Sequence, residues 1–456
     1  MIINNILKYK YPIICFLGIA ILHLSKLNIF LGYFILVLVL VCSSINALAF
    51  IVTGVGSQLL TNPLGLEIQF TQLQIIFFLL FFVFKFKSYV LVKSSFLIKI
   101  FIISILGSVI TLLNNTFELF IPVLTGLCYL VILIIQFTNC KYSPNTLFSV
   151  FVISTLLSGI GFWSFLFDIE TVSMAYEASS IRNIIRMGSG NVDANSVGIT
   201  IPIGFLGLNA LLLSKKKDVL KSNKMTYLAV IFTFIYCIPV VLSTGSRTSI
   251  IILVLGYLIL LLGSLKLKRK YFQVKTAKLF KTISWKFYLL IAMVGLVFVL
   301  LNESAQKVFL ALEKISQFEN NNLSMGFVSG RSALWLDFGK VILTHPLFGC
   351  PSSLKMYVTG LGEINYGEYQ AHNTYLEIAS LLGIPLAILY LSLFFTPIFT
   401  IYKRYKLSKA FPIYVVYVVF FIAFFSISAH SWKTFYIFLA LLWLIVYRKN
   451  RLNEIF

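Results

Sequence analysis

A histidine stands where a polar loop turns into a hydrophobic helix, in the stretch GEYQAHNTYLEIASLLGIP. This residue, His372, is followed by Asn373 and lies at the start of a long apolar run. Near neutral pH an imidazole can accept a proton from a hydroxyl group, so His372 is the candidate general base. The other histidines have structural explanations, namely core packing, a helix end and an interfacial turn for His23, His345 and His430.

Four arginines outside the lysine-rich segments form the second set of candidates: Arg182, Arg186, Arg247 and Arg331. A guanidinium group stays charged and binds phosphate oxygens through two hydrogen bonds, which lysine cannot do. Arg247 stands in STGSRTS, whose small polar residues favour an exposed turn opening into a helix N-terminus, itself an anion site. Two interpretations remain open: a fixed cation for an anionic ligand, and a helix-end arginine bound to carbonyls or lipid phosphate.

Other polar and aromatic residues near these candidates have competing interpretations. Glu377, five residues after His372, orients the imidazole if the backbone allows it; the alternative is a polar residue facing a neighbouring helix. For Tyr375 and Trp335, sugar stacking competes with interfacial packing, and packing is favoured.

The only candidate for a divalent cation site is the pair Asp168 and Glu170. Such a pair is common by chance, and it would follow the sixth predicted span. We therefore expect no metal and no cofactor.

These residues belong to a chain of 456 residues that is 59% hydrophobic and 11% charged. A soluble domain needs more polar surface, and the apolar runs suit helices that span a hydrocarbon layer of about 30 Å. We predict an all-α, polytopic membrane helix bundle with about 12 spans. The candidate spans are residues 11–27, 29–52, 66–84, 96–113, 117–137, 145–167, 195–213, 226–243, 249–264, 285–303, 374–400, 411–429 and 433–447.

The predicted organisation is one integral membrane domain in three parts. Residues 1–303 form an N-terminal transmembrane bundle, residues 304–370 a large extracytoplasmic loop with short helices, and residues 371–456 the C-terminal transmembrane helices. Within the loop, an amphipathic helix is expected from Ser329 to Pro346, with apolar residues at Leu334, Trp335, Phe338 and Ile342.

The formal net charge of +22 arises mainly from lysines in short connections between spans. From residue 66 onward these connections fall on one side if the spans alternate, as the positive-inside rule predicts. The first 55 residues break this parity, so one early segment is expected to be re-entrant or split. We expect contact with anionic membrane lipids and no nucleic-acid partner. The six cysteines are scattered and are interpreted as small core residues.

Six motifs together resemble the O-antigen ligase and O-antigen polymerase superfamily. They are Leu242–Arg247 (LSTGSR), Asp193–Asn195 (DAN), Gly330–Trp335 (GRSALW), Thr344–Gly349 (THPLFG), Ala371–Glu377 (AHNTYLE) and Leu382–Pro385 (LGIP). The spacing from His372 to Gly383 resembles the ligase signature in particular. Leu386 departs from that signature, which favours a polymerase, and Ala194 replaces a common proline. The motif matches run from about residue 193 to 390.

The resemblance implies a metal-independent glycosyltransferase that takes a glycan from an undecaprenyl-diphosphate-linked oligosaccharide. A polymerase passes the glycan to a lipid-linked repeat unit, and a ligase passes it to a lipid A core sugar or another terminal acceptor. The implied catalytic residues are His372, Arg247 and Arg186, and the implied substrate-binding residues are Arg182, Arg331, Asn373 and Asn195. The implied place is the bacterial cytoplasmic (inner) membrane, with the site facing outside or the periplasm, and polysaccharide assembly proteins are possible partners.

Two other classes of protein remain as alternatives. A flippase for lipid-linked sugars would often show inverted repeats and charges at mid-bilayer, and the sequence shows neither. A structural partner in a polysaccharide assembly complex would not need the histidine and the arginines.

Overall fold

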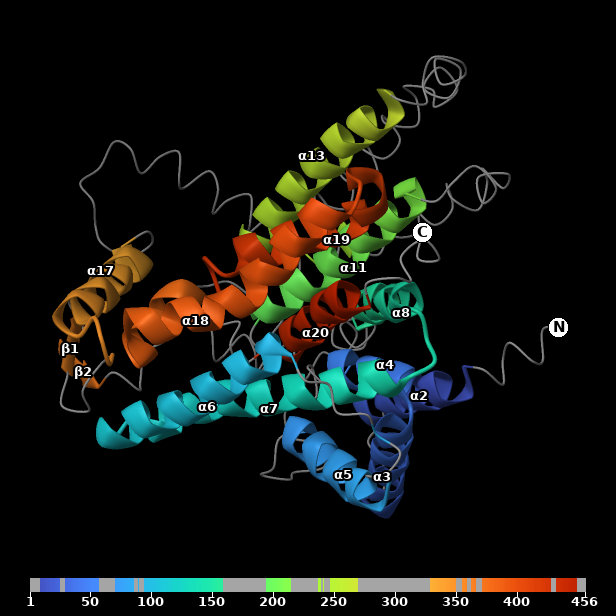
Figure 1. The fold of residues 1–456 in the computed structure, drawn as a ribbon, viewed down its shortest axis with the longest axis horizontal. Helices are drawn as coiled ribbons and strands as arrows, with labels where there is room; N and C mark the ends of the chain where they lie inside the picture. Colours follow the sequence, from blue (N-terminus) through green and yellow to red (C-terminus); the bar gives the residue numbers. More distant parts are fainter. Residues whose placement is uncertain are drawn as a thin grey trace. The chain divides into compact units, whose positions relative to one another are not determined.

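The structure is a computed structural model, and it describes eleven main ranges of the chain together with single residues or pairs at 89, 237–238 and 241. The ranges are 9–24, 29–56, 70–85, 94–158, 194–214, 247–269, 329–349, 355–358, 362–365, 371–427 and 432–448, of which 94–158 holds two long helices and a third one. These residues form helices and one short hairpin (Figure 1).

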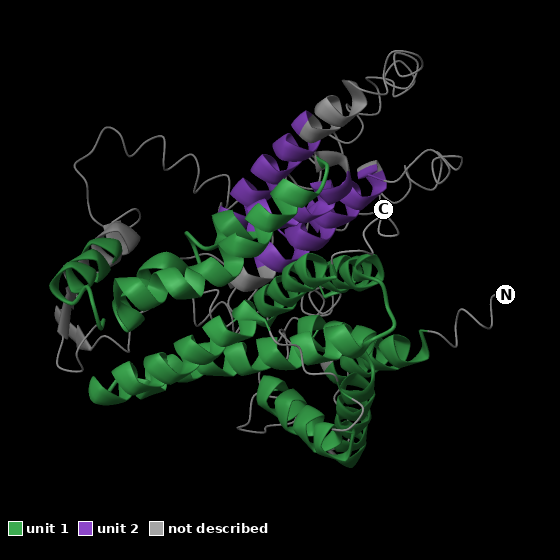
Figure 2. Cartoon of the chain, viewed as in Figure 1, with its two compact units in different colours: residues 1–158, 325–406, 420–456 green, residues 159–324, 407–419 purple. Residues whose placement is uncertain are grey.

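Two compact units divide the chain (Figure 2). The first comprises Met1–Ser158, Met325–Lys406 and Phe420–Phe456, and the second comprises Gly159–Ser324 and Leu407–Val419. The first unit holds α2 (Lys10–Leu24), α3 (Ile29–Ile45), α4 (Ala47–Gly56), α5 (Phe70–Lys85), α6 (Ser95–Leu113), α7 (Phe117–Asn139), α8 (Pro144–Leu157), α17 (Ser329–Thr344), α18 (Thr374–Arg404) and α20 (Lys433–Tyr447). The second holds α11 (Ala194–Ser214) and α13 (Arg247–Arg269), which pack together, and most of α19 (Leu407–Ala423).

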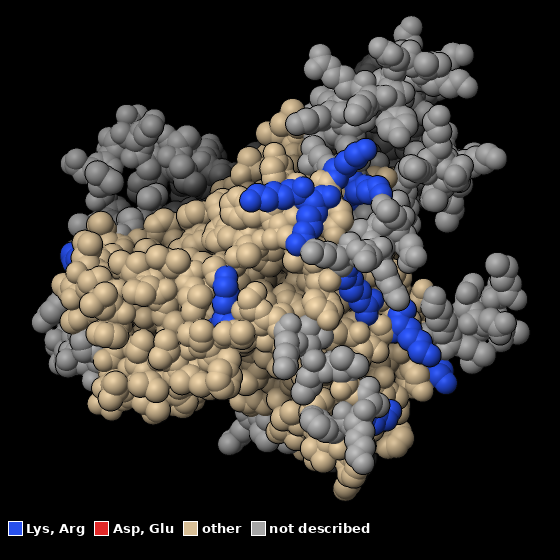
Figure 3. Space-filling model, in the orientation of Figure 1, with Lys and Arg blue, Asp and Glu red and all other residues tan. Residues whose placement is uncertain are grey.

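Among the described residues, α6, α7 and α18 have the length and apolar character needed to cross a membrane. Other predicted spans correspond to shorter apolar helices of 10–17 residues, so the number of about 12 spans stays a prediction. Most of the predicted span 226–243 and all of 285–303 lie outside the described residues. Much of the described surface drawn in Figure 3 is uncharged, as expected of helices that face lipid.

The predicted span 29–52 is in fact two helices, α3 and α4, separated at Asn46. The Asn46 side-chain oxygen accepts the backbone N–H groups of Leu48 and Ala49 at 2.9 and 3.2 Å, which is an N-cap. A cap inside an apolar run ends one helix and starts the next. The expectation of a split early segment is therefore confirmed.

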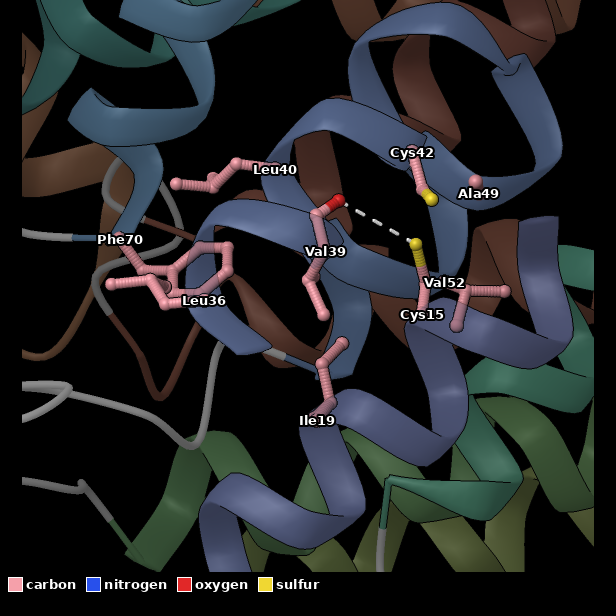
Figure 4. Packing of buried hydrophobic residues seen from close by; sticks show 9 residues of the cluster. All are labelled: Cys15, Ile19, Leu36, Val39, Leu40, Cys42, Ala49, Val52 and Phe70. Atoms are coloured by element: carbon pink, nitrogen blue, oxygen red, sulfur yellow. Dashed lines mark hydrogen bonds between the residues drawn. The ribbon is translucent and has the colours of Figure 1, made fainter. Parts of the chain in front are cut away.

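Helices α2, α3 and α4 share a core with the start of α5, and Figure 4 shows nine of its side chains. Cys15 and Cys42 are buried there, and the Cys15 thiol donates to the carbonyl of Val39 at 3.6 Å. The interpretation of cysteines as small core residues holds for this pair and for Cys237, whereas Cys128 is exposed.

Helix α20 is the centre of the first unit, packing against α7, α8 and α18. Its residues 434–445 are all buried, as in a helix that is apolar on every side. Gly126 of α7 permits the closest approach, because a Cβ there would overlap the Tyr436 ring. The Tyr436 hydroxyl lies 3.1 Å from that of Tyr390, which ties α20 to α18.

The amphipathic helix predicted in the large loop is α17, and it ends two residues before Pro346. Phe338 and Val341 are buried, and α17 packs against α18. The loop also contains a hairpin that the all-α prediction omits. Its strands β1 (Lys355–Val358) and β2 (Gly362–Asn365) pair antiparallel, with Lys355 opposite Asn365.

Candidate functional site

His372 lies at the junction where the chain enters α18, and its backbone is unusual. Its φ is +49°, in the left-handed region, and among the described residues only Asn115 shares this property without being glycine. A side chain in that region costs on the order of 1–3 kcal/mol and persists only where surrounding contacts hold it. The contacts around His372 therefore show what holds its backbone in this conformation.

The first contact comes from α18 itself. The Glu377 carboxylate accepts the backbone N–H of His372 at 2.9 Å, and this side chain is only 7% exposed. Asn373 is the N-cap, because its side-chain oxygen accepts the N–H groups of Tyr375 and Leu376 at 3.1 and 3.2 Å. Glu377 thus contacts His372 through the backbone of the histidine, a connection that neither sequence-based interpretation of Glu377 contained.

Two further contacts join the junction to other elements of the first unit. The Trp335 indole of α17 donates to the carbonyl of Ala371 at 2.9 Å. The Thr374 N–H donates to the carbonyl of Phe424 at 2.8 Å, and its hydroxyl donates to the carbonyl of Ile427 at 2.6 Å. The residues on either side of the His372–Asn373 pair are therefore fixed by two separate elements.

Both aromatic residues near the junction make packing contacts, and their role in sugar stacking stays a prediction. Trp335 contacts the small cluster of Phe338 and Ala371. Tyr375 lies against three phenylalanine rings, and its hydroxyl donates to the carbonyl of Phe421 at 3.4 Å.

Helix α18 is broken at Gly383, whose φ and ψ are 77° and 163°. The Ile384 N–H leaves the helix and donates to the carbonyl of Pro346 at 2.7 Å. Pro385 has no N–H, so two carbonyls one turn earlier lose their usual helical donors. Residues 384–404 extend about 31 Å at about 1.5 Å per residue, which is enough to cross a hydrocarbon layer of about 30 Å. Residues 374–382 therefore form a separate segment that the span does not require.

The break in α18 fits against the turn that follows α17. Gly349 in this turn has a φ of +76°, and a Cβ there would overlap the carbonyls of Ser380 and Leu381. In return, a Cβ at Gly383 would overlap the carbonyl of Leu347. Each glycine is required twice, by its positive φ and by a close backbone approach. The motifs THPLFG and LGIP therefore contact each other through Gly349 and Gly383.

For three other predicted site residues the structure describes only the backbone. Arg331 lies in the first turn of α17, Arg247 begins α13 and Asn195 lies in the first turn of α11, but their side chains lie outside the part that is described. Arg331 belongs to the first unit, and the other two belong to the second. Four residues lie wholly outside the described residues: Arg182, Arg186, Asp168 and Glu170. In the described part of the chain, no group of three or more His, Cys, Asp or Glu could hold a metal ion.

A family model described as O-antigen ligase matches residues 232–391. Residues 232–391 are therefore similar to the O-antigen ligase family. The matched range includes Arg247, Arg331 and His372, whereas Arg182, Arg186 and Asn195 precede it. The resemblance seen in the sequence is confirmed for the matched residues. No curated protein matches the chain.

Within the matched residues, the sequence indicates the candidate residues but not the contacts that support them. In the sequence Gly349 is only the last residue of THPLFG, yet in the structure it lies against the break at Gly383. The sequence feature that could have predicted this contact is a pair of glycines that each lie near a proline, in His-Pro-Leu-Phe-Gly and Gly-Ile-Pro.

Proposed function

We propose that the protein is a surface polysaccharide polymerase of the glycosyltransferase class. In this proposal it transfers a glycan from an undecaprenyl-diphosphate-linked donor to a lipid-linked repeat unit. The reaction takes place on the outer face of the bacterial cytoplasmic membrane. The observation that carries the proposal is the held His372 junction inside the residues that are similar to the O-antigen ligase family.

The proposed reaction is a single displacement with inversion at the anomeric carbon. His372 accepts the proton of the acceptor hydroxyl as its oxygen forms a bond to that carbon. The bond from the anomeric carbon to the diphosphate oxygen breaks, and its electron pair leaves with undecaprenyl diphosphate. No covalent enzyme intermediate and no metal are needed.

The leaving diphosphate gains negative charge, and the proposed role of the arginines is to stabilise it. Arg247 and Arg186 would bind its oxygens, since fixed cations stabilise charge that develops in a transition state. Arg182, Arg331, Asn373 and Asn195 are proposed to bind substrate. For Asn373 this role would use the side-chain NH2 group, because the side-chain oxygen already caps α18.

Preorganisation is what the local structure contributes to this mechanism. A general base acts only within hydrogen-bond reach of the proton that it removes, so its position must be fixed before substrate binds. The buried Glu377 and the bond from Trp335 to Ala371 fix the backbone that carries His372. A residue in a costly conformation is retained where the surrounding structure and function favour it.

Ligation to a terminal acceptor is the second candidate, because the matching family model is described as O-antigen ligase. The sequence feature that favours polymerisation is Leu386, which is buried in α18 and only 6% exposed. The two reactions share a donor and a general base and differ in the acceptor. The family match gives no support to the flippase alternative.

The test is a comparison of His372→Ala with His345→Ala in a strain that lacks the native gene. His345 is a matched control, because its backbone bonds at the end of α17 survive the change to alanine. His372→Ala is expected to leave single repeats on the carrier lipid at the outer surface, with normal protein abundance, whereas His345→Ala keeps the polysaccharide ladder. A ladder that stays on the carrier lipid would indicate a ligase. A normal surface ladder from His372→Ala would refute a catalytic role for this histidine.

A further inference from the structure

Helix α17 has a second apolar face, opposite to the one that packs on α18. Its exposed residues Leu336, Lys340 and Leu343 are separated by four and three positions, which places them within about 60° around the helix, and the exposed Leu347 follows in the turn after it. Leu336 and Leu343 are 68% and 81% exposed, whereas Phe338 on the other side is 1% exposed. The helix is therefore apolar on two sides, and within the part of the chain that the structure describes only one of them is buried against protein.

This outer face continues into the surface of two helices that can cross a membrane. Beside Leu347, Phe348 is 64% exposed, and its carbonyl accepts a hydrogen bond from the Asn114 side chain at the end of α6. Leu113, the last residue of α6, is 78% exposed. On α18, Ile384 is 40% exposed and is hydrogen-bonded to the same turn. The three elements thus share one apolar surface.

We infer that α17 and the turn after it lie in the membrane interface, with Leu336, Leu343 and Leu347 inserted among the acyl chains of lipids. Spans such as α6 and α18 expose apolar side chains because lipid covers them. An apolar face that continues theirs, at the end of α6 and at the break in α18, is covered by the same lipid. Lys340 suits this position, since its chain can reach along the apolar face to bring the ammonium group to lipid phosphates.

This membrane contact has a structural consequence for the junction before α18. Trp335 lies five residues before Lys340 on the same helix, and its indole donates to the carbonyl of Ala371. The depth of α17 in the interface therefore sets the depth of the adjacent His372. The inference needs only the position of α17 at the ends of spans, so it stands apart from the proposed reaction.

The test uses a photo-crosslinking residue in the full-length protein, in native membranes. Leu343→benzoylphenylalanine is compared with the same substitution at Phe101 and at Lys141. Phe101 is 65% exposed on α6 and is the control for acyl-chain contact, and Lys141 is exposed in the polar turn between α7 and α8. After irradiation, intact-protein mass spectrometry is used to measure lipid adducts, and gel electrophoresis is used to detect covalent dimers.

The expected result is a lipid adduct at residue 343 in a yield similar to that at residue 101, with little adduct at residue 141. A covalent dimer at residue 343 would show that a second copy covers this face and would overturn the inference. The absence of an adduct at 343, with a clear adduct at 101, would also overturn it. Leu336→benzoylphenylalanine repeats the measurement in case the first variant does not fold.

Discussion

Replacing Glu377 with alanine tests whether this residue positions His372. The change removes a hydrogen bond between a nearly buried carboxylate and the His372 N–H, with a donor–acceptor distance of 2.9 Å. A hydrogen bond to a charged group contributes about 1.5–3 kcal/mol. That value is comparable to the cost of the left-handed backbone of His372, about 1–3 kcal/mol, so without the bond the histidine is expected to leave its position. If the loss appears wholly as a reduced population of correctly placed His372, kcat falls about 10- to 150-fold, at about 1.36 kcal/mol per tenfold.

The Glu377→Gln variant separates positioning from general destabilisation. Glutamine keeps an oxygen that can accept the same N–H, and a neutral hydrogen bond is about half as strong as a charged one, so a loss of less than about tenfold is expected. The assay is transfer of glycan from the lipid-linked donor in proteoliposomes, with kcat and KM measured separately and protein amount matched. Glu118→Ala is the control, because Glu118 is an exposed acidic residue in the first turn of α7. Equal losses for Glu377→Ala and Glu377→Gln, or wild-type kcat for Glu377→Ala, would refute the positioning role.

Two further predictions concern stability, measured as thermal unfolding in detergent. Gly383→Ala is expected to destabilise by at least about 1 kcal/mol, because the added Cβ meets a positive φ and the carbonyl of Leu347. Gly339→Ala is expected to stabilise by up to about 1 kcal/mol, because the added Cβ in α17 meets nothing within 4 Å. If Gly383→Ala and Gly339→Ala change the stability in the same direction, the proposed role of Gly383 at the break in α18 is wrong. Arg448→Lys is expected to destabilise by about 1.5–3 kcal/mol, whereas Arg404→Lys, with one exposed bond, should change stability by less than about 0.5 kcal/mol. The Arg448 guanidinium donates, at 2.9–3.2 Å, to the carbonyls of Phe137, Thr138, Cys140 and Tyr142, and equal effects of the two arginine variants would contradict its role there.

Local patterns were sufficient to predict several elements. The end of α17 before Pro346 follows from a helix breaker, and the predicted spans for α6 and α7 end within two residues of the observed helices. Asn46 shows the limit of the same approach. A hydropathy run does not reveal that a single asparagine divides it, because its effect depends on local hydrogen bonds.

The candidate site was predictable in its residue types and not in its supports. His372 and Asn373 stand out in the sequence, but the bond from Glu377 depends on a backbone conformation that no residue pattern announces. The contact of Gly349 with Gly383 joins residues far apart in the chain. Such contacts arise from the packing of α17 on α18, and a one-dimensional pattern does not contain them.

Two contacts between the regions of α17 and α18 also affect which sequence changes the protein can tolerate during evolution. One joins Trp335 to Ala371 and the other joins Gly349 to Gly383, so the chain between residues 349 and 371 departs from and returns to the same support. Each doubling of a loop's length adds only about 0.6 kcal/mol to its closure cost. Insertions and deletions in this stretch can therefore accumulate without moving the histidine.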